Sequence, residues 1–243
     1  MSQTYVVTGA SRGLGLEFVN QLAAKGNTVF ACARNPDSAT GLQKLVDNKH
    51  VFAIKLDTTN YESVKAAAKE ISKKAPEGID VLINNAGIDG ETPDTVVETL
   101  LESDLASVFH TNVIGVSNVT KELLPLLQKR GKDHVKKIVN ISSILGSIEL
   151  IDRLSTLPVG VNPAYNISKA ALNMYVKMLA NNLAKDNFIV YSSHPGWVAT
   201  ELGGKSAPVQ AVDSIRGQLA KLESATAKDN GGFFDFEGKT LPW

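Results

Sequence analysis

Cysteine is almost absent, because Cys32 is the one thiol in 243 residues. A single thiol excludes an internal disulfide and a cysteine-based metal cluster, and it suits a reducing compartment, so we expect a cytoplasmic protein. The histidines offer no alternative, since His50, His110 and His134 share no metal-ligand spacing. We expect no metal, and we expect Cys32 and His194 to be structural residues.

Net charge and long apolar runs are also missing. The 25 basic and 25 acidic residues cancel, so no overall field draws the chain to nucleic acid or to an anionic membrane. No run approaches the ~18 apolar residues of a membrane span, and no targeting signal is evident. We therefore expect neither a nucleic-acid nor a membrane partner.

The apolar residues that are present, 43% of the chain, suffice for one sizeable α/β domain. β-branched runs predict buried strands at 5–8, 28–33, 51–55, 81–84, 137–142 and 189–193. Amphipathic segments predict helices at 13–25, 61–74, 103–129 and 163–185. This alternation predicts a mostly parallel sheet with helices on both faces, and such sheets bind ligands beyond the carboxyl ends of their strands.

A glycine-rich turn follows the first predicted strand and opens the first predicted helix. Glycine allows a tight turn and a close approach of the backbone, and a helix N-terminus attracts phosphate, so the turn predicts a nucleotide site. Its glycine spacing differs from G-x-G-x-x-G, which points to a particular family. The residues expected to bind the cofactor here are Gly9, Ser11, Arg12, Gly13, Leu14 and Gly15.

The end of the second predicted strand, 31–35, holds no acid. An NAD enzyme places a carboxylate there, on the ribose 2′-hydroxyl. Arg34, joined by Arg12, is expected instead to grip a 2′-phosphate, because guanidinium matches phosphate oxygens in a bidentate way. NADP(H) is therefore the expected cofactor, unless both arginines are ordinary surface charges.

Polar residues also follow the third and fourth predicted strands. Asp57 is expected to accept a hydrogen bond from the adenine amino group, with a helix cap as the alternative role. Asn85, Ala86 and Gly87 are expected at the cofactor, where amides bridge neighbouring backbone and glycine lets the ribose approach closely. For Asn84 we expect a mainly structural role.

Tyr165 and Lys169 lie four residues apart, so a helix places both side chains on one face. A phenol beside an ammonium is a proton donor with a lowered pKa. Alone, such a pair is usually a solvated amphipathic pair. Together with the glycine turn, it predicts acid–base chemistry beside a nucleotide cofactor, and hence a reductase.

With Asn112 and the serine pair Ser142-Ser143 added, these motifs resemble the short-chain dehydrogenase/reductase family across essentially the whole chain. The similarity is greatest to sniffer-type carbonyl reductases and related fungal ketoreductases, through segments 140–147 and 194–204 and the ending 231–243. The resemblance implies one Rossmann-type, doubly wound α/β domain over 1–243 with a seven-stranded sheet.

The resemblance also implies a role for each catalytic residue. Tyr165 gives its proton to the carbonyl oxygen, while Lys169 stabilises the phenolate and holds the ribose. Ser143 hydrogen-bonds the same oxygen, with Ser142 as the alternative if the register is off by one. Asn112 anchors water that feeds protons to Lys169.

The segment after the sixth strand is implied to hold the nicotinamide and to expose the pro-S hydride. Pro195, Gly196, Val198 and Thr200 make these contacts, and Trp197 covers the site or lines the pocket.

Three irregular stretches, 88–95, 147–162 and 197–208, are expected to form the substrate pocket, the last of them mobile, with plain surface connections as the alternative. The part 149–161 is longer than in many family members and reads as a pocket wall or as a cover over an interface. A cover would block the helix pairing of tetramers, so we expect a monomer or a homodimer. Its apolar residues are Leu150, Ile151, Leu154, Leu157, Val159 and Val161.

The function predicted is an NADPH-dependent reductase that acts on the carbonyl of a small hydrophobic ketone, aldehyde or quinone-like compound. An NADP(H)-binding regulator without turnover and a biosynthetic alcohol dehydrogenase are the alternatives. A regulator needs no proton donor, so the presence of all four catalytic residues favours an enzyme.

Overall fold

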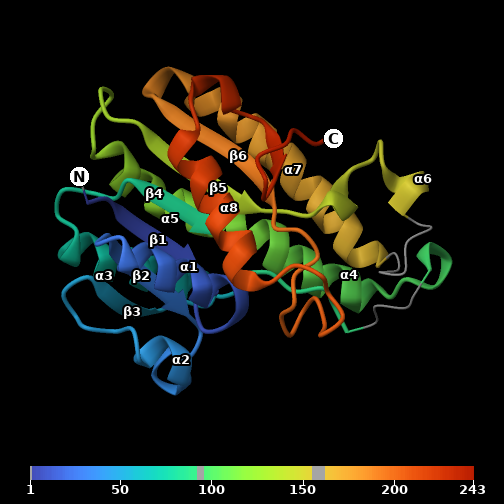
Figure 1. Ribbon diagram of the computed structural model, residues 1–243, viewed down its shortest axis with the longest axis horizontal. Coiled ribbons are helices and arrows are strands. Elements are labelled where there is room, and N and C mark those ends of the chain that lie inside the picture. Colours follow the sequence, from blue (N-terminus) through green and yellow to red (C-terminus); the bar gives the residue numbers. More distant parts are fainter. Residues whose placement is uncertain (1, 92–95, 155–161) are drawn as a thin grey trace.

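The computed structural model describes residues 2–91, 96–154 and 162–243, and in this part seven strands form one sheet, whose arrangement can be followed in Figure 1. The pairings are all parallel, in the order β3-β2-β1-β4-β5-β6-β7. The predicted doubly wound α/β fold is therefore confirmed. The strands are β1 (Thr4–Thr8), β2 (Thr28–Ala33), β3 (Val51–Lys55), β4 (Val81–Asn84), β5 (Lys136–Ile141), β6 (Phe188–His194) and β7 (Phe233–Asp235).

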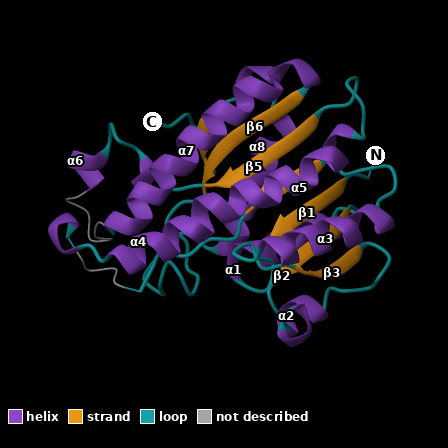
Figure 2. Ribbon diagram, turned by 180° about the vertical axis from the view of Figure 1, so that it is seen from behind, coloured by secondary structure: helices purple, strands orange, loops and turns teal. Residues whose placement is uncertain are grey.

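Helices cover both faces of the sheet. α1 and α8 lie on the face seen in Figure 1, and α3, α5 and α7 lie on the opposite face, seen in Figure 2. None of the described helices combines the length and the apolar content that a bilayer crossing needs. The helices are α1 (Gly13–Ala24), α2 (Thr40–Gln43), α3 (Tyr61–Lys74), α4 (Glu102–Phe109), α5 (Val116–Gln128), α6 (Ile151–Leu154), α7 (Pro163–Leu183) and α8 (Ala211–Ser224).

The core consists of two apolar layers, one on each side of the sheet. The four residues of β4 are all buried, as the continuous apolar run predicts for a strand covered on both faces. Alternate strand residues enter the two layers, so that Leu82 packs toward α3, α5 and α7 while Ile83 packs toward α1 and α8. This packing fixes the carboxyl ends of the strands, where the predicted site residues lie.

The six predicted strands and the four predicted helical regions are confirmed, with boundaries that differ by one or two residues. The predicted helix 103–129 is not uniform, because a π-helical turn, His110–Gly115, separates α4 from α5. Such turns often mark functional positions, and Asn112 lies inside this one. Residues 92–95 and 155–161 of the predicted pocket loops, with Leu157, Val159 and Val161, lie outside the described residues.

Candidate active site

The glycine turn leads from β1 into α1 and is built as an anion site. Gly9 and Gly13 have φ angles of +67° and +54°, which a side chain would strain. A Cβ at Gly15 would lie 2.2 Å from the carbonyl oxygen of Gly9, so only glycine, which has no Cβ, fits at this position. Arg12, the N-cap of α1, makes no side-chain cap bond to a described residue, which leaves the first N–H groups of the helix free for an anion.

The segment after β4 is fastened to this turn. The hydroxyl of Thr8 accepts hydrogen bonds from the backbone N–H groups of Asn85 and Ala86, at 3.0 and 3.1 Å. The amide Nδ2 of Asn85 donates to the carbonyl oxygens of Thr8 and Gly9. The structure thus brings the first and fourth strand ends together at the point where the strand order reverses, which is where open α/β sheets bind ligands.

Asn84 and Asp57 have structural partners. Asn84 Nδ2 donates to Asn140 Oδ1 across the β4–β5 pair at 2.9 Å, so its predicted structural role agrees with its contacts. Asp57 Oδ1 accepts from both the backbone N–H and the hydroxyl of Thr59 in a turn after β3. Asn60, not Asp57, caps α3, so the alternative role considered for Asp57, a helix cap, is wrong.

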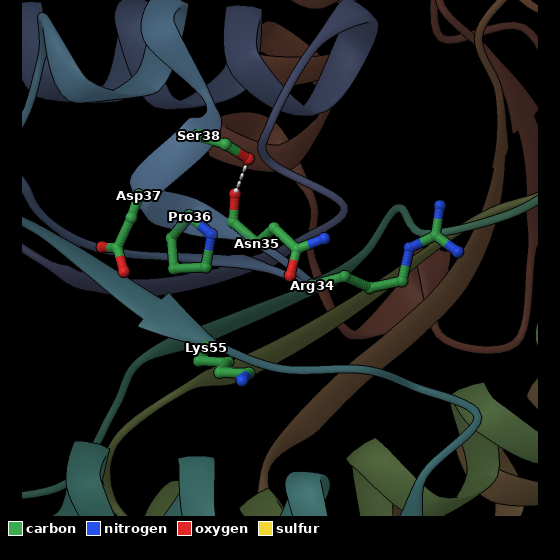
Figure 3. Close-up of a pocket in the computed structure, with 6 residues that line it drawn as sticks. All are labelled: Arg34, Asn35, Pro36, Asp37, Ser38 and Lys55. Atoms are coloured by element: carbon green, nitrogen blue, oxygen red, sulfur yellow. Dashed lines mark hydrogen bonds between the residues drawn. The ribbon is translucent and has the colours of Figure 1, made fainter.

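Arg34 lies at a pocket of about 300 Å³ where β2 and β3 end side by side (Figure 3). Lys55, the last residue of β3, adds a second positive charge that the sequence analysis missed, although it follows from the pairing of Lys55 with Ala33. Asp37 also lines the pocket, two residues beyond the stretch without acids, and Figure 3 shows its side chain and that of Arg34 extending in opposite directions.

Arg12 is not one of the residues that line this pocket. Its Nε pairs with Glu201 Oε2 at 3.0 Å, and both side chains are exposed. Next to this pair, a Cβ at Gly13 would lie 3.7 Å from the side chain of Thr200. Segment 197–208 therefore closes over the glycine turn, and the expected pair of arginines on one phosphate requires Arg12 to exchange partners.

The segment after β6 is held by local bonds. The carbonyl oxygen of Pro195 accepts from the hydroxyl of Ser214 on α8 at 2.6 Å, and Gly196 turns the chain with a φ of +84°. Val198 is buried and forms a parallel bridge with Val209. These contacts fix the backbone that is predicted to face the nicotinamide.

Trp197 and Thr200 close the same segment on itself. Trp197 Nε1 donates to the carbonyl oxygen of Gly203 at 2.7 Å, and Thr200 Oγ1 accepts from the N–H of Gly203 at 3.1 Å. The ring of Trp197 remains 37% exposed, as a residue at the edge of a pocket would be.

Tyr165 and Lys169 share one face of α7, as their spacing predicts. Lys169 Nζ lies 5.3 Å from the centroid of the Tyr165 ring and donates to the carbonyl oxygen of Ile141 at 2.8 Å. The hydroxyl of Ser143 lies close enough to the Tyr165 phenol to lower its pKa, whereas Ser142 donates to an amide of α7. Ser143 is therefore the serine beside the phenol.

The pKa values of Tyr165 and Lys169 are both shifted, and that of Tyr165 shifts in the direction opposite to the one expected. Burial raises the pKa of Tyr165 to about 12, although hydrogen bonding by Ser143 lowers it, and the nearby carboxylate of Asp89 raises it further. Burial also lowers the pKa of Lys169 to about 8. The expected lowering of the phenol pKa is thus wrong for this structure, because desolvation of the phenolate outweighs the lowering by Ser143.

Asn112 joins the π-helical turn to the segment after β4. Its Oδ1 accepts from the N–H of Ile88 at 2.9 Å, and its Nδ2 donates to the carbonyl oxygen of Ile88 and to Ser168 of α7. A Cβ at Gly87 would lie 3.2 Å from Asn112 Oδ1 and 3.6 Å from Lys169 Nζ, so both side chains adjoin Gly87. Both hydrogens of the side-chain amide are thus bonded, so any water that Asn112 anchors has to donate to an oxygen, either Oδ1 or the backbone carbonyl.

Asn162 and Asp89 are two site residues that the sequence analysis missed. Asn162 caps α7, since its Oδ1 accepts from the N–H of Tyr165 at 3.2 Å, and its Nδ2 donates to the carbonyl oxygen of Asp89. The cap had a sequence signal, because Asn followed by Pro163 is typical of a helix start. Nothing in the sequence pattern indicates that Asp89 lies near the phenol.

Of the remaining candidates, Cys32 lies in the core and His194 is half-buried at the end of β6. Burial lowers the pKa of His194 to about 4, so the ring is neutral near pH 7. Cys32 is fully buried in the sheet, and burial raises the pKa of its thiol far above the ordinary value, which leaves it inert. Within the described residues no group of histidine, cysteine and acidic side chains could hold a metal ion.

Comparison with known proteins places this geometry in a family. A family model described as short chain dehydrogenase matches residues 3–210. An uncharacterized oxidoreductase of Schizosaccharomyces pombe is 33% identical over 100% of this chain and 98% of its own length.

Two solved structures are similar over the whole chain. The NADPH-bound carbonyl reductase from chicken fatty liver has a TM-score of 0.92 and 33% identity, covering 100% of this chain and 99% of its own. The carbonyl reductase Sniffer of D. melanogaster has a TM-score of 0.91 and 30% identity, covering 100% of both chains. The protein is thus an oxidoreductase that belongs to the short-chain dehydrogenase/reductase family, as its motifs indicated.

Proposed function

We propose that the protein is an NADPH-dependent carbonyl reductase. The observation that carries the proposal is the pairing of two hydroxyls from different elements, Ser143 after β5 and Tyr165 on α7, beside the buried ammonium of Lys169. Two neighbouring hydroxyls can both bond a single carbonyl oxygen, and only one of them needs to give up a proton. The similarity to an NADPH-bound carbonyl reductase supports the same reaction.

Each residue has a definite part in the proposed reduction. NADPH, when bound, supplies the hydride that the carbonyl carbon receives. The raised pKa of Tyr165 keeps its phenol protonated near pH 7, so the phenol can act as a general acid. Ser143 holds the carbonyl oxygen in line with that proton. The ammonium of Lys169 leaves the carbonyl oxygen of Ile141 and stabilises the phenolate that remains after the proton is given up.

The cofactor proposal rests on the anion-binding features of the chain. The free N–H groups at the start of α1 suit a pyrophosphate, and the pocket that holds Arg34 and Lys55 suits a 2′-phosphate. Asp37 in the same pocket works against a phosphate, but its side chain extends away from Arg34. Asp57, Asn85, Ala86, Gly87 and the 195–200 segment are proposed to complete the cofactor site.

The substrate class proposed is a small hydrophobic ketone, aldehyde or quinone-like compound. Ile148 and Leu202 expose 76% and 50% of their surface on two of the proposed pocket segments, and Trp197 is partly exposed on the second. Exposed apolar side chains around polar catalytic groups are typical of a site for an apolar ligand. We further propose a single domain over 1–243, a monomer or homodimer, and a cytoplasmic location.

Steady-state assays with NADPH and a panel of aromatic ketones, aldehydes, dicarbonyls and quinones test the proposal. We expect turnover of at least one class, with faster turnover for apolar members. The absence of turnover for every carbonyl, with NADPH binding intact, contradicts it. Turnover of alcohols alone with NADP⁺ would instead indicate a dehydrogenase.

Tyr165→Phe separates an enzyme from a cofactor-binding regulator. The change removes the proton donor and little else, so reduction should fall by roughly 10²-fold or more while the Kd for NADPH stays within about twofold. Tyr175→Phe is the matched control, because Tyr175 lies on the same helix but bonds Ser117 and Thr120 of α5. Equal activity of Tyr165→Phe and wild type would contradict the assignment.

A further inference from the structure

We propose that Trp243 is a positioning residue for the substrate pocket, because it anchors the segment that follows Ser143. This inference rests on the proposed carbonyl reduction and adds a residue to it. In both views the C-terminus lies beside α7, the helix that carries Tyr165 (Figures 1 and 2).

The chain after β7 folds back along that strand. Asp235 turns it, since Asp235 Oδ1 accepts from the N–H of Lys239 at 2.9 Å and Asp235 N–H donates to the carbonyl oxygen of Lys239. The N–H of Leu241 then donates to the carbonyl oxygen of Phe233 at 2.8 Å. The last residues are therefore held in a defined position at the edge of the sheet.

Trp243 contacts three separate parts of the molecule. Its ring stacks on Phe233 of β7, with centroids 5.4 Å apart and planes at 21°, and Phe233 is only 1% exposed. The ammonium of Lys177, on α7, lies 5.8 Å from the centroid of the Trp243 ring and donates to the carbonyl oxygen of Gly231. The carbonyl oxygen of Trp243 accepts from the N–H of Glu149 at 2.9 Å.

The contact with Glu149 is connected to the catalytic serine through a short turn. Ser143 Oγ accepts from the N–H of Leu145 at 3.2 Å, and Ser147 N–H donates to the carbonyl oxygen of Ile144. This turn lies directly on α7, because a Cβ at Gly146 would be 2.7 Å from the carbonyl carbon of Lys169. Segment 143–149 is thus fixed at one end by α7 and at the other by Trp243.

Loss of the indole ring removes the stack on Phe233. Beyond Leu241, the hydrogen bond to Glu149 is then the one described contact that still holds the end of the tail, and alone it does not fix its position. The wall at 147–150, including the exposed Ile148, then moves relative to Ser143. The glycine turn lies at a different part of the sheet edge and makes none of these bonds. The substrate should therefore be affected and the cofactor should not.

Trp243→Ala and Trp243→Phe in the full chain test the inference, with a carbonyl that the wild type reduces. We expect Trp243→Ala to raise KM for the carbonyl by roughly tenfold, with kcat changed less and the Kd for NADPH within about twofold. Trp243→Phe should restore most of the KM, because a second aromatic ring can stack on Phe233. Lys239→Ala is the control, since its ion pair with Glu237 lies in the same tail away from Glu149.

Hydrogen–deuterium exchange gives a second reading that does not depend on turnover. Trp243→Ala should speed exchange in peptides that cover 144–150 and leave the glycine turn unchanged. An unaltered KM together with unaltered exchange overturns the inference, even if the wild type reduces carbonyls. Failure of the wild type to reduce any carbonyl would overturn the proposed function alone, because the exchange experiment still tests the anchor.

Discussion

Lys169 combines a charge with deep burial, since its side chain is 4% exposed and its ammonium donates to the carbonyl oxygen of Ile141. Its pKa of about 8 is below the ordinary 10.5, so the unfolded chain binds more protons between these values than the folded protein. Unfolding free energy therefore rises with pH across this window. Below pH 8 the full cost of burying the charge is present, which places a destabilising group at the centre of the proposed site.

Lys169→Met is expected to stabilise the protein while it abolishes reduction. At pH 7 the change removes a buried charge and one hydrogen bond, for a net gain of about 2 kcal/mol in unfolding free energy. The gain should shrink above pH 8 and give way to a small loss of stability by about pH 10.5, where Lys169 is neutral in both states and only the loss of its hydrogen bond to Ile141 remains. Denaturant unfolding at pH 7 and pH 10 checks this sign, and a variant less stable than wild type at pH 7 would refute it.

Asp89→Asn is expected to lower the pKa of Tyr165. The carboxylate disfavours the phenolate, so its removal makes the phenol easier to ionise. Spectrophotometric titration of the phenolate measures the change, with Asp89→Asn/Tyr165→Phe as the control that identifies the signal. Reduction at pH 7 should change little because the phenol stays protonated, and an unchanged titration curve would contradict the placement of Asp89.

At the scale of the elements, the start of α7 links two features of the site. Asn162 caps the helix at the N–H of Tyr165 and also holds the carbonyl oxygen of Asp89. One side chain thus sets the first turn of the helix and the position of the loop after β4. The capping role is a local sequence property, but the link to Asp89 spans 73 residues and depends on the fold.

Asn162→Ala should cost about 1 kcal/mol of stability, as the loss of an N-cap does, and should also reduce kcat/KM for the carbonyl. Asn60→Ala is the matched control, because Asn60 caps α3 in the same way at the N–H of Ser63. It should lower the unfolding free energy by a similar amount with activity intact. Equal kinetic effects of the two variants would show that Asn162 has no special place in the site.

The elements predicted from sequence are those with a strong local pattern. The buried runs of β1 to β6 and the motif at Tyr165 follow from apolar periodicity and residue type alone. β7 has only three residues, Phe233–Asp235, and its pairing with β6 is a property of the sheet. The π-helical turn around Asn112 interrupts a pattern that stays apolar on the same face, so periodicity does not reveal it.

At the scale of the whole molecule, the parallel sheet gathers residues from distant segments at one edge. Local motifs identified Ser143, Tyr165 and Lys169, and the fold brings the first two side by side. Charges that act across the fold were not predictable in this way. Lys55 reaches the Arg34 pocket through strand pairing, and Glu201 meets Arg12 through a loop that crosses the glycine turn.

Arg34→Ala tests the cofactor preference that this arrangement implies. We expect the Kd for NADPH to rise by roughly tenfold or more and the Kd for NADH to change little, because only NADPH carries the 2′-phosphate. Titration of cofactor fluorescence measures both. Lys25→Ala, which removes an exposed ion pair with Glu223, is the control. Equal weakening of both cofactors would contradict a 2′-phosphate site at Arg34.

The most direct test of the central claim is the fate of deuterium from (4S)-deuterated NADPH in a single turnover with a reducible carbonyl. Mass spectrometry of the product should find one deuterium on the new alcohol carbon for the wild type, and labelled alcohol should form roughly 10²-fold or more slowly for Tyr165→Phe. An unlabelled alcohol from the wild type would contradict transfer of the pro-S hydride, and equal labelling by Tyr165→Phe would contradict assistance of that transfer by Tyr165.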